Sequence, residues 1–409
     1  MLIRLLKAIY HYPRKVLRGW SLNKPEIILR IYGLVRSEKL RGLRVLEFDE
    51  VIGSPEKCGC GFKHDKTLKV VLFGSLNESL RKLKEFGLTS PYAVFYDEIT
   101  YEVAGKAVCE ILEAKGLLVR APTFQEAEAR SQELGGVRTV IAVGGGTVID
   151  VAKYASYVSK VDFVSIPTAP SHDGIVSPIA SLFTEKRRKS VLARSPVAAI
   201  VDPSILASAP QDLIASGFGD ILAKLVSLKD WQLGRDEREE PYCVVAESLI
   251  MNALNLVINA LSSGFDAEKR VKMLAEALIN SGVAMMVVGS SRPASGSEHL
   301  ISHYLDMNLK KRLRHGIQCA LGALAMAVYH ETRNQNWWRE ERYRWKSLRS
   351  YMRKAGIPER LSDVGISTEI MIDAITSSWR IRPHRYTILH KYNPTRAEAL
   401  NILKESGLI

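Results

Sequence analysis

The chain has 409 residues, of which 46% are hydrophobic and 25% charged, as is typical of a soluble globular protein. No apolar run approaches the roughly 20 residues needed to cross a bilayer, which argues against a membrane-spanning protein. Five scattered cysteines, an odd number, argue against a disulfide framework.

The net charge of +13 is concentrated at the N-terminus, because residues 1–44 carry 11 Lys or Arg against two Glu. A basic amphipathic segment can lie on an anionic membrane surface, or it can cap a domain or mediate assembly. No nucleic-acid reader motif accompanies the charge, so we expect no nucleic-acid partner. The segment also lacks a signal-peptide cleavage pattern, and a cytoplasmic location is the resulting expectation.

The stretch KCGCGFKHD holds Cys58, Cys60 and His64. Two thiols and an imidazole could hold zinc, but the C-x-C-x3-H spacing lacks the second ligand pair of a structural site. A glycine-rich surface loop is therefore the favoured interpretation, with a metal site as the alternative.

Residues 45–205 alternate short apolar runs with helix-period segments. We expect six buried strands, namely LKVVLFGS, PYAVFYDE, GLLVRAPT, VRTVIAVGGG, VDFVSIPT and VAAIVDP. Segments such as 77–87 and 101–116 are expected to be helices. This alternation predicts a Rossmann-like α/β domain with a mostly parallel sheet and helices on both faces.

Residues 206–409 change in character. Long segments such as 241–264 and 267–290 have apolar residues at spacings of three and four, with almost no strand signal. They predict an all-helical second domain. We expect a ligand in the cleft between the two domains.

The stretch TVIAVGGGTVIDVAKYAS (139–156) predicts a strand, a triple-glycine turn and a helix. Glycines 144–146 would let a phosphate approach the N–H groups of the helix start. The pattern is neither G-x-G-x-x-G nor a P-loop, and a simple tight turn is the alternative. Asp97, after another strand, could accept a ribose hydroxyl and favour NAD over NADP.

The stretch SIPTAPSHDGIVSP (165–178) also follows a strand and is rich in polar side chains. A loop at the carboxyl edge of a parallel sheet is where ligands bind. The alternative is a turn built from Pro, Ser and Gly.

Candidate metal ligands lie on three predicted helices. Asp220 is expected at a helix start after two glycines, where an N-cap is the alternative, and Lys224 follows one turn on. His299 and His303, four residues apart, share a helix face, either as working groups or as core histidines. His315 opens a further helix. One carboxylate and two imidazoles would make an open three-ligand divalent site.

Six segments in chain order carry a resemblance to a known family: GGGTVIDVAK, PTAPSHDGIVSP, GFGDILAKLVSLKDW, SRPASGSEHLISH, RHGIQCALGA and RIRPHRYTIL. Together they resemble the sn-glycerol-1-phosphate dehydrogenase family. More broadly, they are similar to the iron- or zinc-dependent alcohol dehydrogenases, glycerol dehydrogenase and dehydroquinate synthase. The resemblance implies a dehydroquinate synthase-like architecture. The basic extension and the CGCGFKH stretch have no counterpart in it.

The resemblance implies roles for individual residues. Asp220, His299 and His315 would bind one divalent metal, with zinc favoured and nickel or iron as alternatives. Asp173 and His303 would contact the substrate and act in catalysis, with Asp220 beside it. NAD or NADP would be held by the glycine turn and polar loop, at Gly144, Gly145, Gly146, Thr147, Val148, Ile149, Asp150, Thr168, Ala169, Pro170, Ser171 and Ser177.

The implied reaction is NAD(P)H-dependent reduction of dihydroxyacetone phosphate to sn-glycerol 1-phosphate, a backbone for archaeal-type ether phospholipids. Positive partners for the substrate phosphate are sought among Lys224, Arg292, Arg380, Arg382 and Arg385. The alternatives are a dehydrogenase of an unphosphorylated polyol and a membrane-associated inactive homologue. The apolar helical surfaces suggest a homo-oligomer.

Overall fold

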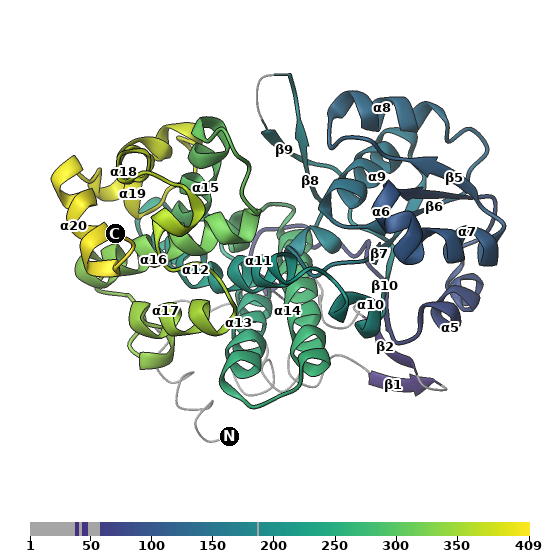
Figure 1. Ribbon diagram of the computed structural model, residues 1–409, viewed down its shortest axis with the longest axis horizontal. Coiled ribbons are helices and arrows are strands. Elements are labelled where there is room, and N and C mark those ends of the chain that lie inside the picture. The colour runs from purple at the N-terminus through teal and green to yellow at the C-terminus, as the bar shows by residue number, and fades with distance from the viewer. Residues whose placement is uncertain (1–36, 41–42, 48–57, 186–187) are drawn as a thin grey trace.

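The computed structural model describes residues 37–40, 43–47, 58–185 and 188–409. The predicted membrane contact of the basic segment falls mainly on residues 1–36, which lie outside the described residues. Figure 1 shows an α/β part and a helical part side by side, with α13 and α14 between them.

Within these ranges, eight strands form one sheet in the order β1-β2-β3-β10-β7-β6-β4-β5. β1, β2 and β3 are antiparallel neighbours, and the pairings from β3 through β10, β7, β6 and β4 to β5 are parallel. β8 and β9 form a separate antiparallel hairpin. The strands are β1 (Ser37–Leu40), β2 (Leu43–Glu47), β3 (Val70–Phe73), β4 (Tyr92–Tyr96), β5 (Lys115–Leu118), β6 (Thr139–Gly144), β7 (Asp162–Pro167), β8 (Ile179–Phe183), β9 (Arg188–Leu192) and β10 (Ala198–Val201).

The predicted α/β class is confirmed, because the six predicted strands are β3, β4, β5, β6, β7 and β10. β1 and β2 were not predicted, and β2 spans the boundary between residues 44 and 45, where we placed the start of the α/β domain. Its Leu43 and Val45 are buried against the sheet. β2 lies between β1 and β3, and the charged residues Arg44 and Glu47 make up two of its five positions, so it lacks the continuous apolar run of the parallel strands.

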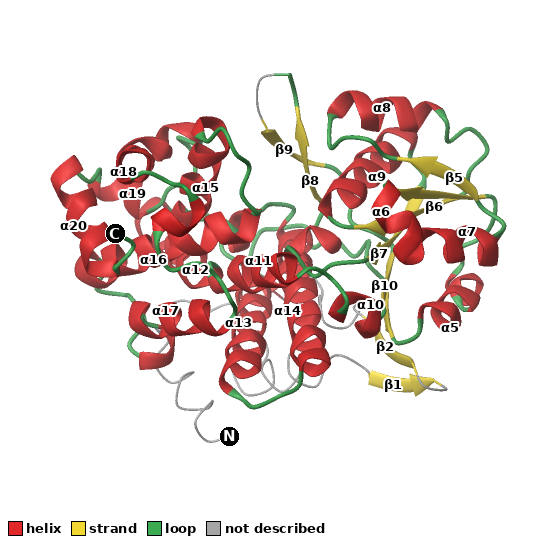
Figure 2. Cartoon of the chain, in the orientation of Figure 1, coloured by secondary structure: helices red, strands yellow, loops and turns green. Residues whose placement is uncertain are grey.

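After β10, every described element is a helix or a turn (Figure 2). The α-helices are α5 (Leu76–Arg81), α6 (Glu98–Thr100), α7 (Lys106–Leu112), α8 (Phe124–Gln132), α9 (Gly146–Ser159), α10 (Pro203–Ala207), α11 (Gln211–Leu222), α12 (Lys224–Arg238), α13 (Val244–Ser262), α14 (Ala267–Val288), α15 (Ser297–Asn308), α16 (His315–Arg333), α17 (Trp345–Lys354), α18 (Thr368–Ser377), α19 (Ile388–Tyr392) and α20 (Arg396–Ser406).

Two of these helices, α13 and α14, are long and apolar enough to cross a membrane by length and composition. Our expectation that no apolar run has this length therefore needs correction. In the most apolar 18-residue stretch of each helix, 56% of the residues of α13 and 83% of those of α14 are buried inside the structure. Burial of this kind is what core helices show, because their apolar faces already pack against other parts of the chain.

The two faces of the sheet pack against different partners. In β6, Ile141 and Val143 belong to the apolar cluster that includes Leu80 and Val108 of the outer helices. The alternate residue Val140 belongs to the larger cluster, which is continuous with the helical part. Burial on both faces explains why the parallel strands have continuous apolar sequences.

Candidate active site

The glycine turn and the polar loop lie at the same edge of the sheet. Gly144, which ends β6, pairs in register with Pro167, which ends β7, and Thr168 N–H donates to the carbonyl of Gly144 at 3.1 Å. α9 begins directly after this turn, so its free N–H groups face the edge. A Cβ built on Gly146 would meet Nε2 of His172 at 2.1 Å, so the loop packs directly on the turn.

A buried lysine holds the polar loop in place. Lys153 on α9 donates to Oδ1 of Asp150 at 2.9 Å and to the carbonyls of Gly174 and Ile179 at 2.9 and 2.7 Å. Oδ2 of Asp150 accepts from the N–H of Ser181 at 3.1 Å. In the structure, Asp150 therefore braces the loop and β8. Its predicted contact with a cofactor stays a prediction.

The position predicted for Asp220 at a helix start is wrong. α11 begins at Gln211, and Asp220 lies in its last turn. The glycines that suggested a start lie inside the helix, where other segments approach closely. A Cβ on Gly217 would come within 1.8 Å of the Pro170 carbonyl, and one on Gly219 within 2.3 Å of the Gly316 carbonyl.

Asp220 belongs to a buried charge cluster with Lys224 and Asp173. Lys224 Nζ lies 2.7 Å from Oδ1 of Asp220 and 2.9 Å from Oδ2 of Asp173. Burial alone would raise the pKa of Asp220, but the Lys224 ammonium, His299 and the hydrogen bond from the Asp173 N–H together hold that pKa below its usual range. Burial opposes the charge of Lys224, and the two carboxylates outweigh it, so its pKa is raised.

The predicted metal ligands converge. Ligand atoms of Asp220, His299, His315 and Cys319 all lie within 4.8 Å of one another. His299 Nε2 is 3.8 Å from Oδ1 of Asp220, and the two imidazole ring centres are 5.1 Å apart. One carboxylate and two imidazoles are donors that suit zinc and related divalent ions. The donor set therefore fits such an ion.

Glu298 and Cys319 belong to this cluster and were not predicted. Oε1 of Glu298 lies 2.6 Å from Nδ1 of His299, so Nδ1 donates and Nε2 faces Asp220. Cys319 Sγ is 3.6 Å from Nε2 of His315. The i, i+4 spacing of His315 and Cys319 on one helix was the sequence signal for the thiol. The contact between Glu298 and His299 could not be predicted from their spacing, because adjacent residues on a helix do not normally face each other.

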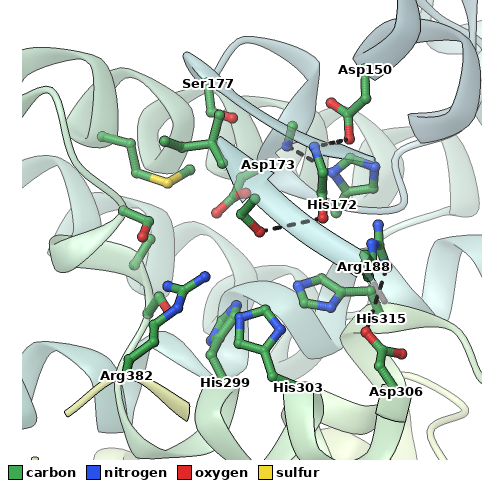
Figure 3. Close-up of a pocket in the computed structure, with 18 residues that line it drawn as sticks. Asp150, His172, Asp173, Ser177, Arg188, His299, His303, Asp306, His315 and Arg382 are labelled. Carbon is green, nitrogen blue, oxygen red and sulfur yellow. Dashed lines mark hydrogen bonds and ion pairs between the residues drawn. The ribbon is translucent and has the colours of Figure 1, made fainter. Parts of the chain in front are cut away.

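A pocket between the two parts of the chain brings the predicted substrate groups together (Figure 3). Asp173 comes from the polar loop, while His299, His303 and His315 come from α15 and α16. Burial, with Arg382 nearby, lowers the pKa of His303 well below its usual range. Its neutral ring therefore presents one N–H donor and one acceptor. His299 and His303 thus share a helix face that borders one pocket.

The candidate phosphate partners occupy different environments. Arg292 pairs with Glu240 at 2.6 Å and is buried, and Arg385 donates to the Ser295 carbonyl at 2.8 Å. Arg380 is exposed. Arg382 lines the pocket, and its guanidinium has no ion-pair partner among the described residues.

A second cation at the pocket was not predicted. Arg188, which begins β9, lines the pocket 3.8 Å from Oδ2 of Asp306 on α15. Its position depends on how the β8–β9 hairpin packs, and no motif in the sequence marks it.

Of the other predicted cofactor residues, Ser177 lines the pocket and Thr168 and Ser171 are buried at the sheet edge. Asp97 follows β4 and caps α6, where Oδ1 accepts from the N–H of Thr100 at 2.8 Å. The helix cap accounts for this carboxylate, and its contact with a ribose stays a prediction.

The chain is similar to known proteins along most of its length. The sequence profile of iron-containing alcohol dehydrogenases matches residues 70–210. A glycerol-1-phosphate dehydrogenase [NAD(P)+] of Thermococcus kodakarensis is 40% identical over 334 residues, which are 80% of this chain and 92% of that protein. The protein of the same name from Sulfurisphaera tokodaii is 43% identical over 274 residues, which are 67% of this chain and 75% of that protein.

Solved structures share the fold at lower identity. A probable glycerol dehydrogenase from Sinorhizobium meliloti superposes with a TM-score of 0.66 at 19% identity, covering 85% of this chain and 97% of that one.

Proposed function

This chain belongs to the glycerol-1-phosphate dehydrogenase family, and on that premise we propose that it reduces dihydroxyacetone phosphate to sn-glycerol 1-phosphate with NAD(P)H. The observation that carries the proposal is the convergence of the ligand atoms of Asp220, His299 and His315, because His299 and His315 also line the pocket. The curated relatives do not favour an unphosphorylated polyol as substrate or an inactive homologue.

Asp220, His299 and His315 would hold one divalent ion, and zinc is the ion that we propose from this donor set. Such an ion would act as a Lewis acid toward the substrate carbonyl, while NAD(P)H supplies the hydride. Lys224 neutralises part of the charge of Asp220 and Asp173, whose carboxylates it contacts at 2.7 and 2.9 Å.

The remaining pocket residues would orient the substrate. The second oxygen of Asp220 accepts from the N–H of Asp173, and Ser281 donates to the Asp173 carboxylate at 2.8 Å. These contacts fix one wall of the pocket, and His303 lies on the other. A rigid pair of walls presents one face of the carbonyl to the hydride and so sets the hand of the product. His303 would hold or pass the proton that the product oxygen takes up.

The phosphate would lie between Arg382 and Arg188. Both line the pocket, and a guanidinium matches the geometry of phosphate oxygens. The glycine turn at the start of α9 would receive the diphosphate of NAD(P). Substrate and cofactor would thus enter the same pocket from its two sides.

The test is oxidation of NADH and NADPH by metal-replete protein with dihydroxyacetone phosphate, with dihydroxyacetone as the matched substrate and chiral analysis of the product. We expect turnover of the phosphorylated ketone and formation of the sn-1 isomer. Preference for dihydroxyacetone, or formation of the sn-3 isomer, would contradict the proposal. A homo-oligomer is a further expectation, since Ile99 and Val103 expose apolar side chains near one another, and light scattering checks it.

A further inference from the structure

A second cluster of metal-ligating side chains lies outside the pocket. Cys58, Cys60 and His64 come from the segment that precedes β3, and Cys243 lies directly before α13. Their ligand atoms all lie within 4.8 Å of one another. The sequence suggested a surface loop for residues 58–64, but Cys58 and His64 are only 8% and 6% exposed.

Two of the distances within this cluster match the edges of a zinc-centred tetrahedron, and a third is shorter. With Zn–S about 2.3 Å and Zn–N about 2.0 Å, tetrahedral geometry places two sulfurs about 3.8 Å apart and a sulfur and a nitrogen about 3.5 Å apart. Cys58 Sγ and Cys243 Sγ are 3.8 Å apart. His64 Nε2 lies 3.5 Å from Cys243 Sγ and 3.1 Å from Cys60 Sγ.

The backbone of the CGCG stretch is shaped to bring its ligands together. Gly59 has φ of +62° and Gly61 has φ of +77°, both in the left-handed region that favours glycine. A side chain would find open space at either position, so the backbone angle is what requires glycine. The two turns lead from Cys58 through Cys60 to His64.

Hydrogen bonds link the three thiols of the cluster. A hydrogen bond with Cys243 lowers the pKa of Cys58 to about 4, although burial acts against this. Hydrogen bonds with Cys243 and with the N–H of Phe62 lower the pKa of Cys60 to about 6, again against burial. The hydrogen bonds with Cys58 and Cys60, together with burial, raise the pKa of Cys243. Its position at the start of a 19-residue helix, by contrast, favours negative charge.

We propose that Cys58, Cys60, His64 and Cys243 bind a structural zinc ion that is separate from the ion at Asp220, His299 and His315. Four protein ligands fill a tetrahedral zinc site, whereas a catalytic site leaves a position open. None of the four residues lines the active-site pocket. The inference therefore stands independently of the proposed function.

The ion would connect two regions that are far apart in the sequence. His64 and Cys243 are 179 residues apart, and the segment after His64 enters β3. In the same segment, Leu68 N–H lies 3.5 Å from Met286 Sδ on α14. Zinc would thus join the segment before β3, the first parallel strand, to the helical pair α13 and α14. It would add a cross-link between the short loop of residues 58–64 and the start of α13.

The experiment uses the full chain with His299→Ala, which should remove the active-site ion while all four residues of the thiol cluster stay in place. We expect about one zinc per chain by elemental analysis, released when a mercurial reagent titrates the thiols. Adding Cys60→Ser in this background should remove that zinc and lower the thermal midpoint. Cys109→Ser, a partly buried thiol outside the cluster, is the matched control and should retain the zinc.

A second measurement needs no cysteine variant, which matters if Cys60→Ser fails to fold. His299→Ala protein produced with cobalt should show intense thiolate-to-cobalt charge-transfer absorption with the visible bands of tetrahedral cobalt. Absence of zinc together with absence of these bands would overturn the proposal. So would a disulfide between Cys58 and Cys243 in protein kept under reductant, because it would consume two of the four ligands.

Discussion

The ammonium nitrogen of Lys224 lies 2.7 Å from Oδ1 of Asp220, one helical turn away, with both side chains almost completely buried. The same nitrogen is 2.9 Å from Oδ2 of Asp173. The lysine therefore balances two carboxylates at the point where a divalent cation is expected.

Replacing Lys224 by Gln should destabilise the metal-free protein by about 3–5 kcal/mol, because the buried carboxylate of Asp220 and the partly buried carboxylate of Asp173 lose their counter-charge. Zinc should then stabilise the variant more than it stabilises the wild type, since the ion supplies the missing charge. Thermal unfolding with chelator and with zinc measures both effects. Lys229→Gln is the control, because Lys229 is also buried on α12 but contacts Trp338 and the Asn336 carbonyl. Equal zinc effects in the two variants would contradict the assignment.

His299→Ala and His303→Ala should separate metal binding from handling of the substrate. His299→Ala should lose one metal equivalent and turnover, since it removes a predicted ligand. His303→Ala should keep the metal and lose about 10²–10⁴-fold in kcat, the range for a proton-transfer residue. Elemental analysis and steady-state kinetics on both proteins give the comparison. If His299→Ala retains the full metal content of the wild type, the ligand set is wrong.

Glu298→Gln should weaken metal binding at the active site by about 10–100-fold, as expected for loss of a carboxylate that orients a ligating imidazole. The reason is the 2.6 Å contact between Oε1 of Glu298 and Nδ1 of His299. Titrating zinc into chelator-treated protein and following recovery of activity, in parallel for the variant and the wild type, measures this change, since both proteins keep the thiol cluster. Glu331→Gln is the control. Glu331 lies on α16 and pairs with Arg344, so its replacement should leave the zinc titration unchanged.

Arg382→Ala should raise KM for dihydroxyacetone phosphate by about 10–100-fold, the equivalent of one charge-assisted hydrogen bond of about 1.5–3 kcal/mol. Activity with dihydroxyacetone should change little, since that ketone has no phosphate. Arg380→Ala serves as the control, because Arg380 is exposed and stacks on Trp379. A similar loss with both ketones would show that Arg382 supports the fold and not phosphate binding.

Asp230→Asn should lower stability by about 3–5 kcal/mol at neutral pH, because Asp230 is a buried anion with several partners. It accepts from the N–H groups of Ser297 and Ile388 at 2.7 Å each, and His330 Nε2 lies 3.2 Å away. Burial alone would raise the pKa of Asp230, but His330 and these hydrogen bonds lower it.

The pH dependence follows from that lowered pKa. A depressed carboxyl pKa contributes stability above the unfolded value, about 3.9, and loses it as the pH falls through the folded value. The difference in unfolding free energy between wild type and Asp230→Asn should therefore be constant near neutrality and narrow below about pH 4. Denaturant titrations across this range measure it, with the exposed Asp236→Asn as control. If the difference in unfolding free energy between wild type and Asp230→Asn grows as the pH falls, the pKa of Asp230 is not lowered in the folded protein.

Much of the fold follows from the sequence by itself. Continuous apolar runs identified the six parallel strands, since burial on both faces of a sheet leaves no polar alternation. The helix that begins at His315 and the shared face of His299 and His303 follow from the 3.6-residue period. These are local properties, because each depends on residues within a few positions along the chain.

The tertiary structure alone decided which distant side chains meet. The glycines before Asp220 suggested a helix start, and packing against the carbonyls of Pro170 and Gly316 placed them inside a helix. Packing also brought Cys243 to a segment 179 residues earlier, completing a set of four ligands that the CGCGFKH spacing lacks. Ligand sets depend on positions in space, and the sequence pattern records neighbours only within one helix or strand.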